Sequence, residues 1–225
     1  MNNLIPTIVC FQGSAWYCAQ HKTIKYIGDA LNTAKILSDS DVSEIALINL
    51  DPTINDYLLD IPKHVNRPIS ISGGINNLNC ARQLIAEGFD RLGFTYPFHN
   101  NPNLPKNVID QLGESTVAIH IRSNHLEQLP ALLKLAINHC SASEYIIHDL
   151  NLAGSLNGLD SNYVRFIENL TDKNYAISGG YKGEFIPDVL RVYYSTHYMF
   201  PLCKKSQIGG ISDHDLKSFL IKAKV

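Results

Sequence analysis

The chain has 225 residues, a formal net charge of -2 and an apolar fraction of 45%, so it can bury a core and does not have the composition of a disordered protein. It has no Lys/Arg-rich run that would indicate a nucleic-acid partner and no apolar stretch of membrane-spanning length. Five scattered cysteines without a C-x-x-C pair predict reduced thiols in a cytoplasmic protein. The first residues lack the charged and apolar regions of a signal peptide.

Short apolar segments alternate with amphipathic ones along the chain. Several are apolar on nearly every residue, as are strands of parallel sheets that are covered on both faces. The predicted strands are residues 5–11, 44–50, 68–72, 91–95, 116–121, 144–150, 175–178 and 189–195. The predicted helices are residues 28–40, 77–88, 125–139, 160–170 and 212–223. This α/β alternation predicts a closed (β/α)8 TIM barrel, with an open doubly wound sheet as the alternative.

Three short sequence segments occur twice, in the same order and with nearly the same spacing between the two copies, which indicates an internal duplication. The phrase Ile-Ser-Gly-Gly occurs at 71–74 and again 106 positions later. The strand that opens with Glu44 recurs 100 positions later at Glu144, and the Thr7 phrase recurs 109 positions later. We therefore predict a single domain over residues 1–225, made of half-barrels of about 1–113 and 114–225.

The repeated glycine pairs are predicted to follow barrel strands three and seven, at the C-terminal face. A glycine pair lets the backbone approach a ligand closely, and its N–H groups can hold phosphate oxygens, which barrels often bind in these loops. Gly73, Gly74, Gly179 and Gly180 would then form two phosphate sites across the mouth, suited to a ligand with two phosphates. The alternative is that each pair only makes a tight turn.

These phrases resemble the histidine-biosynthesis barrel family, which comprises the cyclase subunit of imidazole glycerol phosphate synthase and the related phosphoribosyl-formimino isomerase. The matching landmarks, in chain order, are 5–6, 28–35, 44–51, 71–77, 116–119, 153–160 and 177–180. The resemblance, mainly to the cyclase branch, implies a duplicated barrel that binds a bisphosphate ligand and, if active, acts as a lyase or in a related ammonia-dependent amidation. It adds Thr95, Gly154, Ser155 and Ser195 to the phosphate-binding residues, and we expect no cofactor.

The catalytic positions depart from the family. The family's acid/base pair of aspartates corresponds to Val9 and His120 when the first strand is aligned on Pro6. If the strand is aligned on Cys10 instead, the first aspartate corresponds to Gln12. The family's catalytic lysine falls near Tyr17. Proton transfer by a positioned side chain typically contributes about 10²–10⁴-fold to a rate. Most of the family's usual chemistry is therefore expected to be lost.

Two histidines end neighbouring strands and are predicted to face the mouth. His120 and His148, together with Tyr17, are the candidate catalytic residues. A histidine can act as an acid or base at cellular pH, or bind a metal, for which His197 is the best candidate third ligand. The alternative is that His120 only hydrogen-bonds a neighbour or the ligand.

The opposite end of the barrel keeps charged residues of the family. In the synthase, ammonia from a class I glutaminase enters through a ring of charges, which the resemblance places at Glu44, Arg91 and Glu144, with Asn3 where an arginine is expected. Asp90 falls on a position that contacts the glutaminase. The same charges could equally form a structural plug.

Three functions remain open from the sequence. The chain could be a divergent cyclase-type or isomerase-related enzyme, a non-catalytic module that binds a phosphorylated ligand or activates a glutaminase, or a structural barrel whose site has decayed.

Overall fold

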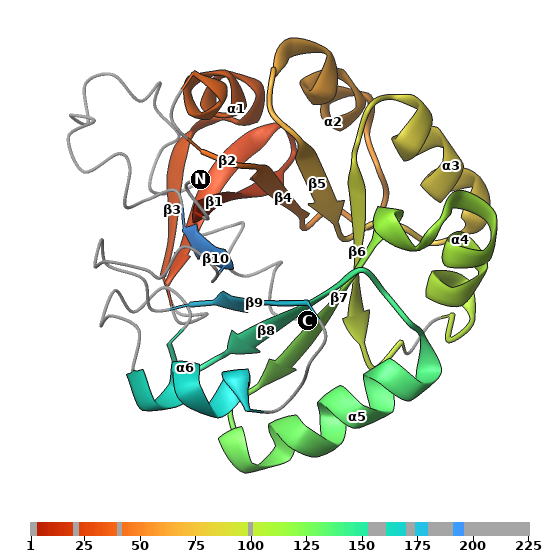
Figure 1. The fold of residues 1–225 in the computed structure, drawn as a ribbon. Helices are drawn as coiled ribbons and strands as arrows, with labels where there is room; N and C mark the ends of the chain where they lie inside the picture. Colours follow the sequence, from red (N-terminus) through yellow and green to blue (C-terminus); the bar gives the residue numbers. More distant parts are fainter. Residues whose placement is uncertain are drawn as a thin grey trace.

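Parallel strands form a closed barrel that is surrounded by helices (Figure 1). The computed structural model describes residues 4–19, 23–39, 42–98, 101–152, 161–169, 174–179 and 191–195. Within them the barrel strands are β1 (Leu4–Phe11), β4 (Ile45–Asn49), β5 (Ile69–Ser72), β6 (Arg91–Tyr96), β7 (Val117–Ser123), β8 (Glu144–Asp149), β9 (Tyr175–Ser178) and β10 (Arg191–Ser195). Each pairs in parallel with the next, and β10 pairs in parallel with β1. The predicted barrel is confirmed and the open sheet is excluded.

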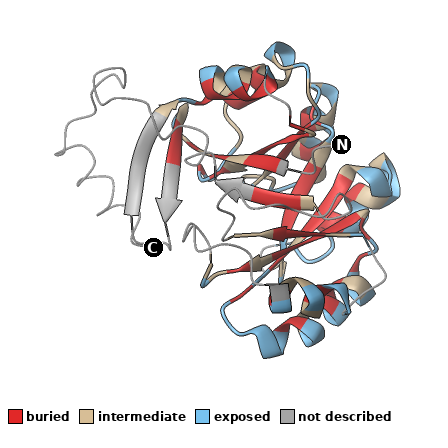
Figure 2. Ribbon diagram, turned by 60° about the vertical axis from the view of Figure 1, so that its left-hand side comes forward, coloured by how far each residue is buried: buried red, intermediate tan, exposed pale blue. Residues whose placement is uncertain are grey.

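The predicted strands agree with the observed ones to within two residues in the described part of the chain. The agreement has a simple cause, because these strands bury both faces and so read as continuous apolar runs. On β7, for example, Ile119 and Ile121 pack outward in the core shared with the helices, whereas Ala118 packs inward. Figure 2 shows buried residues along the barrel strands and exposed residues on the outer faces of the helices.

A hairpin after the first barrel strand was not predicted. Strands β2 (Ser14–Ala19) and β3 (Thr23–Asp29) are antiparallel, and β2 pairs back onto β1. The turn between β1 and β2 has positive φ at Gln12 (48°) and Gly13 (77°), as in the turns that suit two-residue hairpins. The carboxylate of Asp51 accepts a hydrogen bond from the Gln12 N–H at 3.0 Å, which ties the hairpin to the loop after β4.

The helices are α1 (Ala30–Ser38), α2 (Asp56–Asp60), α3 (Leu78–Ala86), α4 (Leu104–Leu112), α5 (Leu129–His139) and α6 (Ser161–Glu168), with 3-10 turns η1 (Ile61–His64), η2 (Glu114–Thr116) and η3 (Leu126–Gln128). Helices α1, α3, α5 and α6 were predicted, whereas α2 and α4 were not, and the predicted helix 212–223 lies outside the described residues. None of the described helices is long and apolar enough to cross a membrane.

The two glycine turns lie at the same end of the barrel. Gly73 and Gly74 follow β5, which is barrel strand three, and Gly179 follows β9, which is barrel strand seven. Because all barrel strands are parallel, both turns belong to the rim at the C-terminal ends of the strands. This is the rim on which barrel enzymes carry their sites.

Candidate functional site

The glycine turn after β5 lines a cavity of about 330 Å³ at the C-terminal rim. Thr95 of β6 and Leu104, which opens α4, line the same cavity. Gly73 and Gly74 have φ of 88° and 75°, in the region that favours glycine. A side chain at Gly73 would overlap the backbone oxygen of Asn49, so both the conformation and the space require glycine.

The second predicted phosphate site is described only in part. Gly179 has a φ of 107° and ends β9, so its backbone resembles that of Gly73. Ser195 ends β10, and only its backbone is described. Gly154, Ser155 and Gly180 lie outside the described residues.

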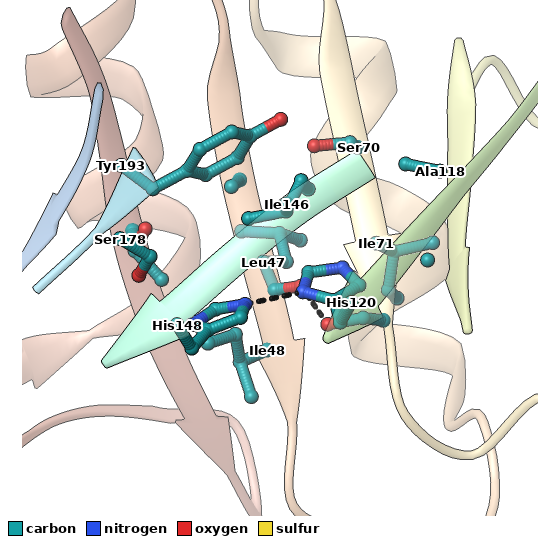
Figure 3. Close-up of a pocket in the computed structure, with 14 residues that line it drawn as sticks. Leu47, Ile48, Ser70, Ile71, Ala118, His120, Ile146, His148, Ser178 and Tyr193 are labelled. Carbon is teal, nitrogen blue, oxygen red and sulfur yellow. Dashed lines mark hydrogen bonds between the residues drawn. The ribbon is translucent and has the colours of Figure 1, made fainter. Parts of the chain in front are cut away.

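His120 and His148 meet inside the barrel mouth, as their positions on neighbouring strands predict (Figure 3). Nδ1 of His120 lies 2.8 Å from Nε2 of His148, a hydrogen-bond distance, and the rings stack at a centroid distance of 5.0 Å and an angle of 23°. They line a cavity of about 20 Å³ together with the hydroxyl residues Thr7, Ser70, Ser72, Ser178 and Tyr193. That volume holds about one water molecule.

Gly93 on β6 makes room for the histidine pair. A side chain there would overlap Nε2 of His120, and Gly93 does not have the positive φ that would itself require glycine. The sequence interpretation missed this residue, because a glycine inside a strand says only that something approaches closely. What approaches here is an imidazole from the next strand.

Both histidines are neutral at physiological pH. Burial lowers the pKa of His120 to about 4, and the positive charge of Arg122 acts in the same direction. Burial, followed by the charges of His120 and Arg122, lowers the pKa of His148 well below its ordinary value. One N–H is therefore shared between the two rings, and one N–H and one lone pair remain for other partners.

These depressed pKa values predict a loss of stability in acid. Between about pH 6.5 and pH 4, the histidines of the unfolded chain bind protons while His120 of the folded chain does not, so acid favours unfolding. Stability is full above this window and falls within it, on the order of 3 kcal/mol for His120. Urea unfolding at a series of pH values measures the slope. We expect His120→Gln to reduce it; equal slopes in wild type and His120→Gln would contradict the interpretation.

The other predicted catalytic positions lie on β1 and β2. Val9 is half-buried in β1, on the same strand face as Ile5 and Thr7, and has no group that transfers protons. Tyr17 lies on β2, opposite Lys25 of β3, and only its backbone is described. Its catalytic role stays a prediction.

The described residues contain no group of three His, Cys, Asp or Glu side chains arranged to hold a metal ion. His197, the candidate third ligand for the histidine pair, lies outside them.

The opposite end of the barrel carries a ring of four charges. Arg91 Nη1 lies 2.7 Å from Glu144 Oε2 and 3.6 Å from Glu44 Oε2. Arg191 Nη2 lies 2.6 Å from Glu44 Oε2, and its Nη1 lies 2.8 Å from Glu144 Oε1. The Tyr193 hydroxyl donates a hydrogen bond to Glu144 Oε2 at 3.1 Å. The glutamate side chains are only 7% and 3% exposed, so each arginine neutralises buried charge.

The structure brings together the three predicted ring residues and adds one that the sequence interpretation missed. Asn3, where the resemblance expects an arginine, lies outside the described residues; among the described ones, Arg191 of β10 supplies a fourth charge. The repeat offers a signal that could have found it, because Arg91 and Arg191 are 100 positions apart, as are Glu44 and Glu144. Each half of the barrel therefore contributes one glutamate and one arginine.

Asp90 is exposed beside Arg91 and has a structural partner. Its Oδ2 accepts a hydrogen bond from the backbone N–H of Ile69 at 2.8 Å, at the start of β5. Its predicted contact with a glutaminase stays a prediction.

The sequence was compared with those of known proteins. The model of the family described as "Histidine biosynthesis protein" matches residues 3–193. The imidazole glycerol phosphate synthase subunit HisF of Blochmanniella pennsylvanica is 26% identical over 188 residues, which cover 72% of this chain and 73% of the relative. The subunit of the same name from Pseudoalteromonas translucida is 22% identical over 204 residues, 79% of each chain. A putative subunit, hisF3, from Vibrio vulnificus is 22% identical over 124 residues, 52% of this chain and 48% of the relative.

Proposed function

The chain belongs to the histidine biosynthesis protein family, and on that premise we propose that it is a HisF-like barrel that binds a phosphorylated, sugar-type ligand in its mouth. The ligand has a phosphate at each end, and the barrel receives ammonia from a class I glutaminase partner. The family's two catalytic aspartates are replaced by Val9 and His120, so the reaction differs from that of the usual cyclase.

The observation that carries this proposal is the cavity beside Gly73, Gly74 and Thr95. Its volume of about 330 Å³ falls in the range of small-molecule sites. Two consecutive residues of positive φ present their backbone to it, and α4 begins at its edge with Leu104. Backbone N–H groups in such turns and at helix N-termini favour phosphate.

The replaced residues support a changed reaction. Val9 cannot exchange a proton, and His120 is a neutral imidazole hydrogen-bonded to His148. If the chain is active, the pair and Tyr17 take over proton transfer, since the pair keeps one N–H and one lone pair free. If it is inactive, the same mouth binds the ligand without turnover.

The ring of charges supports ammonia entry at the N-terminal end. The pair formed by Glu44 and Arg91 is its longest contact, at 3.6 Å, and Glu44 Oε1 and Arg91 Nε have no hydrogen-bond partner among the described residues. An opening for ammonia between Glu44 and Arg91 would therefore break fewer contacts than an opening elsewhere in the ring. The relatives are named as subunits of a synthase, which favours a partner subunit for this chain too. We place the protein in the cytoplasm, in keeping with the free thiols of Cys10, Cys80 and Cys140.

Calorimetric titration with a sugar bisphosphate and the matching monophosphate tests the ligand. We expect the bisphosphate to bind more tightly and Thr95→Ala to weaken its binding by about tenfold, because a hydrogen bond to a charged group is lost. Thr116→Ala is the matched control, since the Thr116 hydroxyl bonds only Gly113 O on the exposed η2 turn. Equal binding of the two sugars, or equal loss in both variants, would argue against two phosphate sites.

Two further measurements test the loss of the usual cyclase reaction and the ammonia part of the proposal. Expression in a histidine auxotroph that lacks the cyclase subunit is expected to give no growth; growth would show that Val9 and His120 do not abolish cyclase activity. Co-purification with a class I glutaminase and stimulation of glutamine hydrolysis are expected for both an enzymatic and a non-catalytic barrel. If neither is found, the ammonia part of the proposal fails.

A further inference from the structure

Arg122 is an arginine of the barrel mouth that the phosphate sites and the histidine pair leave unassigned. On β7, side chains two residues apart share a face, and Ala118 and His120 both face the barrel interior. Arg122 therefore faces the same way, one step closer to the C-terminal rim. In the β7–β8 register it is paired with His148. Its guanidinium thus belongs to the layer above the histidine pair.

The charge of Arg122 has no partner in the described part of the chain. No hydrogen bond or ion pair joins it to another described residue, whereas Arg91 and Arg191 each contact two glutamates. Arg122 is exposed at the mouth, but partial desolvation by neighbouring groups lowers the pKa of its guanidinium. The strand register places Arg122 opposite His148 and two residues after His120 on the same face of β7, and in keeping with this its charge lowers the pKa of both histidines. An arginine in such a position is prepared to bind an anion.

We infer that Arg122, His120 and His148 bind an anionic oxygen group of the ligand, a carboxylate or a phosphate, at the centre of the mouth. The guanidinium fork donates two parallel hydrogen bonds to such a group, and the N–H that the histidine pair leaves free donates a further one. This inference rests on the proposed function, in that the same mouth holds the ligand whose phosphate lies at Gly73 and Gly74.

The arrangement favours an anion over a metal cation. A metal would need the lone pairs of both His120 and His148, and those rings already use one lone pair on their mutual hydrogen bond. The positive charge of Arg122 beside them would also repel the cation. With Val9 and His120 in place of two carboxylates, the centre of the mouth has changed from a site that holds negative charge to one that attracts it.

Nuclear magnetic resonance of the whole chain tests the inference with two probes, inorganic phosphate in one arm and acetate in the other. We expect the imidazole signals of His120 and His148 to shift on addition of at least one probe, and the arm that shifts them identifies phosphate or carboxylate as the preferred group. Arg122→Gln should weaken that binding by about tenfold. Arg122→Lys, which keeps the charge but not the fork, should weaken it less. Arg82→Gln, at an exposed arginine of α3, is the matched control and should bind as wild type does.

The possible outcomes separate this inference from the proposed function. Amide shifts at Gly74 and Thr95 without shifts of His120 and His148 would overturn the inference and leave the phosphate cavity standing. The reverse pattern would support the inference and remove the phosphate cavity. Undiminished binding by Arg122→Gln, with a wild-type thermal midpoint, would also overturn it. If Arg122→Gln does not fold, Arg122→Lys provides the test. The inference is then overturned if Arg122→Lys binds the probe as tightly as wild type and the imidazole signals of His120 and His148 do not shift.

Discussion

Replacing Glu144 by alanine is expected to lower the free energy of unfolding by roughly 3–5 kcal/mol, because it leaves Arg91 and Arg191 to share the single carboxylate of Glu44. Glu144 accepts from Arg91 at 2.7 Å, from Arg191 at 2.8 Å and from the Tyr193 hydroxyl at 3.1 Å, and its side chain is only 3% exposed. The alanine variant therefore loses three interactions at the N-terminal end of the barrel, those of Glu144 with Arg91, Arg191 and Tyr193. Urea unfolding monitored by circular dichroism measures the change.

Glu87→Ala is the matched control for this substitution. Glu87 pairs with Lys63 at 3.1 Å near the surface, where the side chains of Lys63 and Glu87 are 52% and 32% exposed. Exposed pairs contribute about 0–1 kcal/mol, so we expect a change below about 1 kcal/mol. A comparable loss in both variants would mean that the ring of charges does not stabilise the barrel beyond an ordinary surface pair.

Replacing Gly73 by alanine is expected to abolish phosphate binding at the rim and to cost roughly 3 kcal/mol or more of stability. Two effects add: the positive φ of 88° is unfavourable for alanine, and its Cβ would overlap the backbone oxygen of Asn49, which cannot move without distorting β4. If the chain folds, the turn must shift and the cavity beside Gly74 and Thr95 must change shape. Denaturant unfolding and titration with inorganic phosphate measure the two effects.

Gly113→Ala separates conformational strain from overlap. Gly113 also has a positive φ, 98°, but the nearest atom to an added Cβ is the Ser115 hydroxyl at 4.0 Å, an ordinary contact. We expect a cost of about 1–3 kcal/mol from strain alone and unchanged phosphate binding. Phosphate affinity that survives Gly73→Ala would show that the glycine pair only makes a turn.

Most of the barrel could be predicted from the sequence, because its signals are local. Apolar runs such as 116–121 identify strands buried on both faces, and the repeated glycine phrases place the turns that follow strands three and seven. Strands β2 and β3 were missed in part because the turn that leads from β1 into β2, Gln12-Gly13, lacks the Asn-Gly or Asp-Gly signal. The five-residue α2 is too short to show a helical period. Helix α4 is as long as α1 and α3, and length does not explain why it was missed.

The candidate site was predicted in part. His120 and His148 could be paired in advance, because they end neighbouring strands, and the structure places their rings 5.0 Å apart. Gly93 and Arg122 carried no signal of their own in the sequence. Their meaning depends on the register between β6, β7 and β8, which local patterns do not contain.

By itself the sequence determined the kind of molecule, an α/β barrel with glycine turns on one rim. Its duplication and the loss of the family's pair of aspartates stay predictions from the sequence. Only the tertiary structure decided that Arg191 completes the ring of charges, that Gly93 admits the His120 ring, and that Arg122 is paired with His148 in the β7–β8 register. The physical reason is that strand identity follows from residues close together in the chain, whereas charge and steric fit act through space, across strands whose relative register is fixed only when the barrel closes.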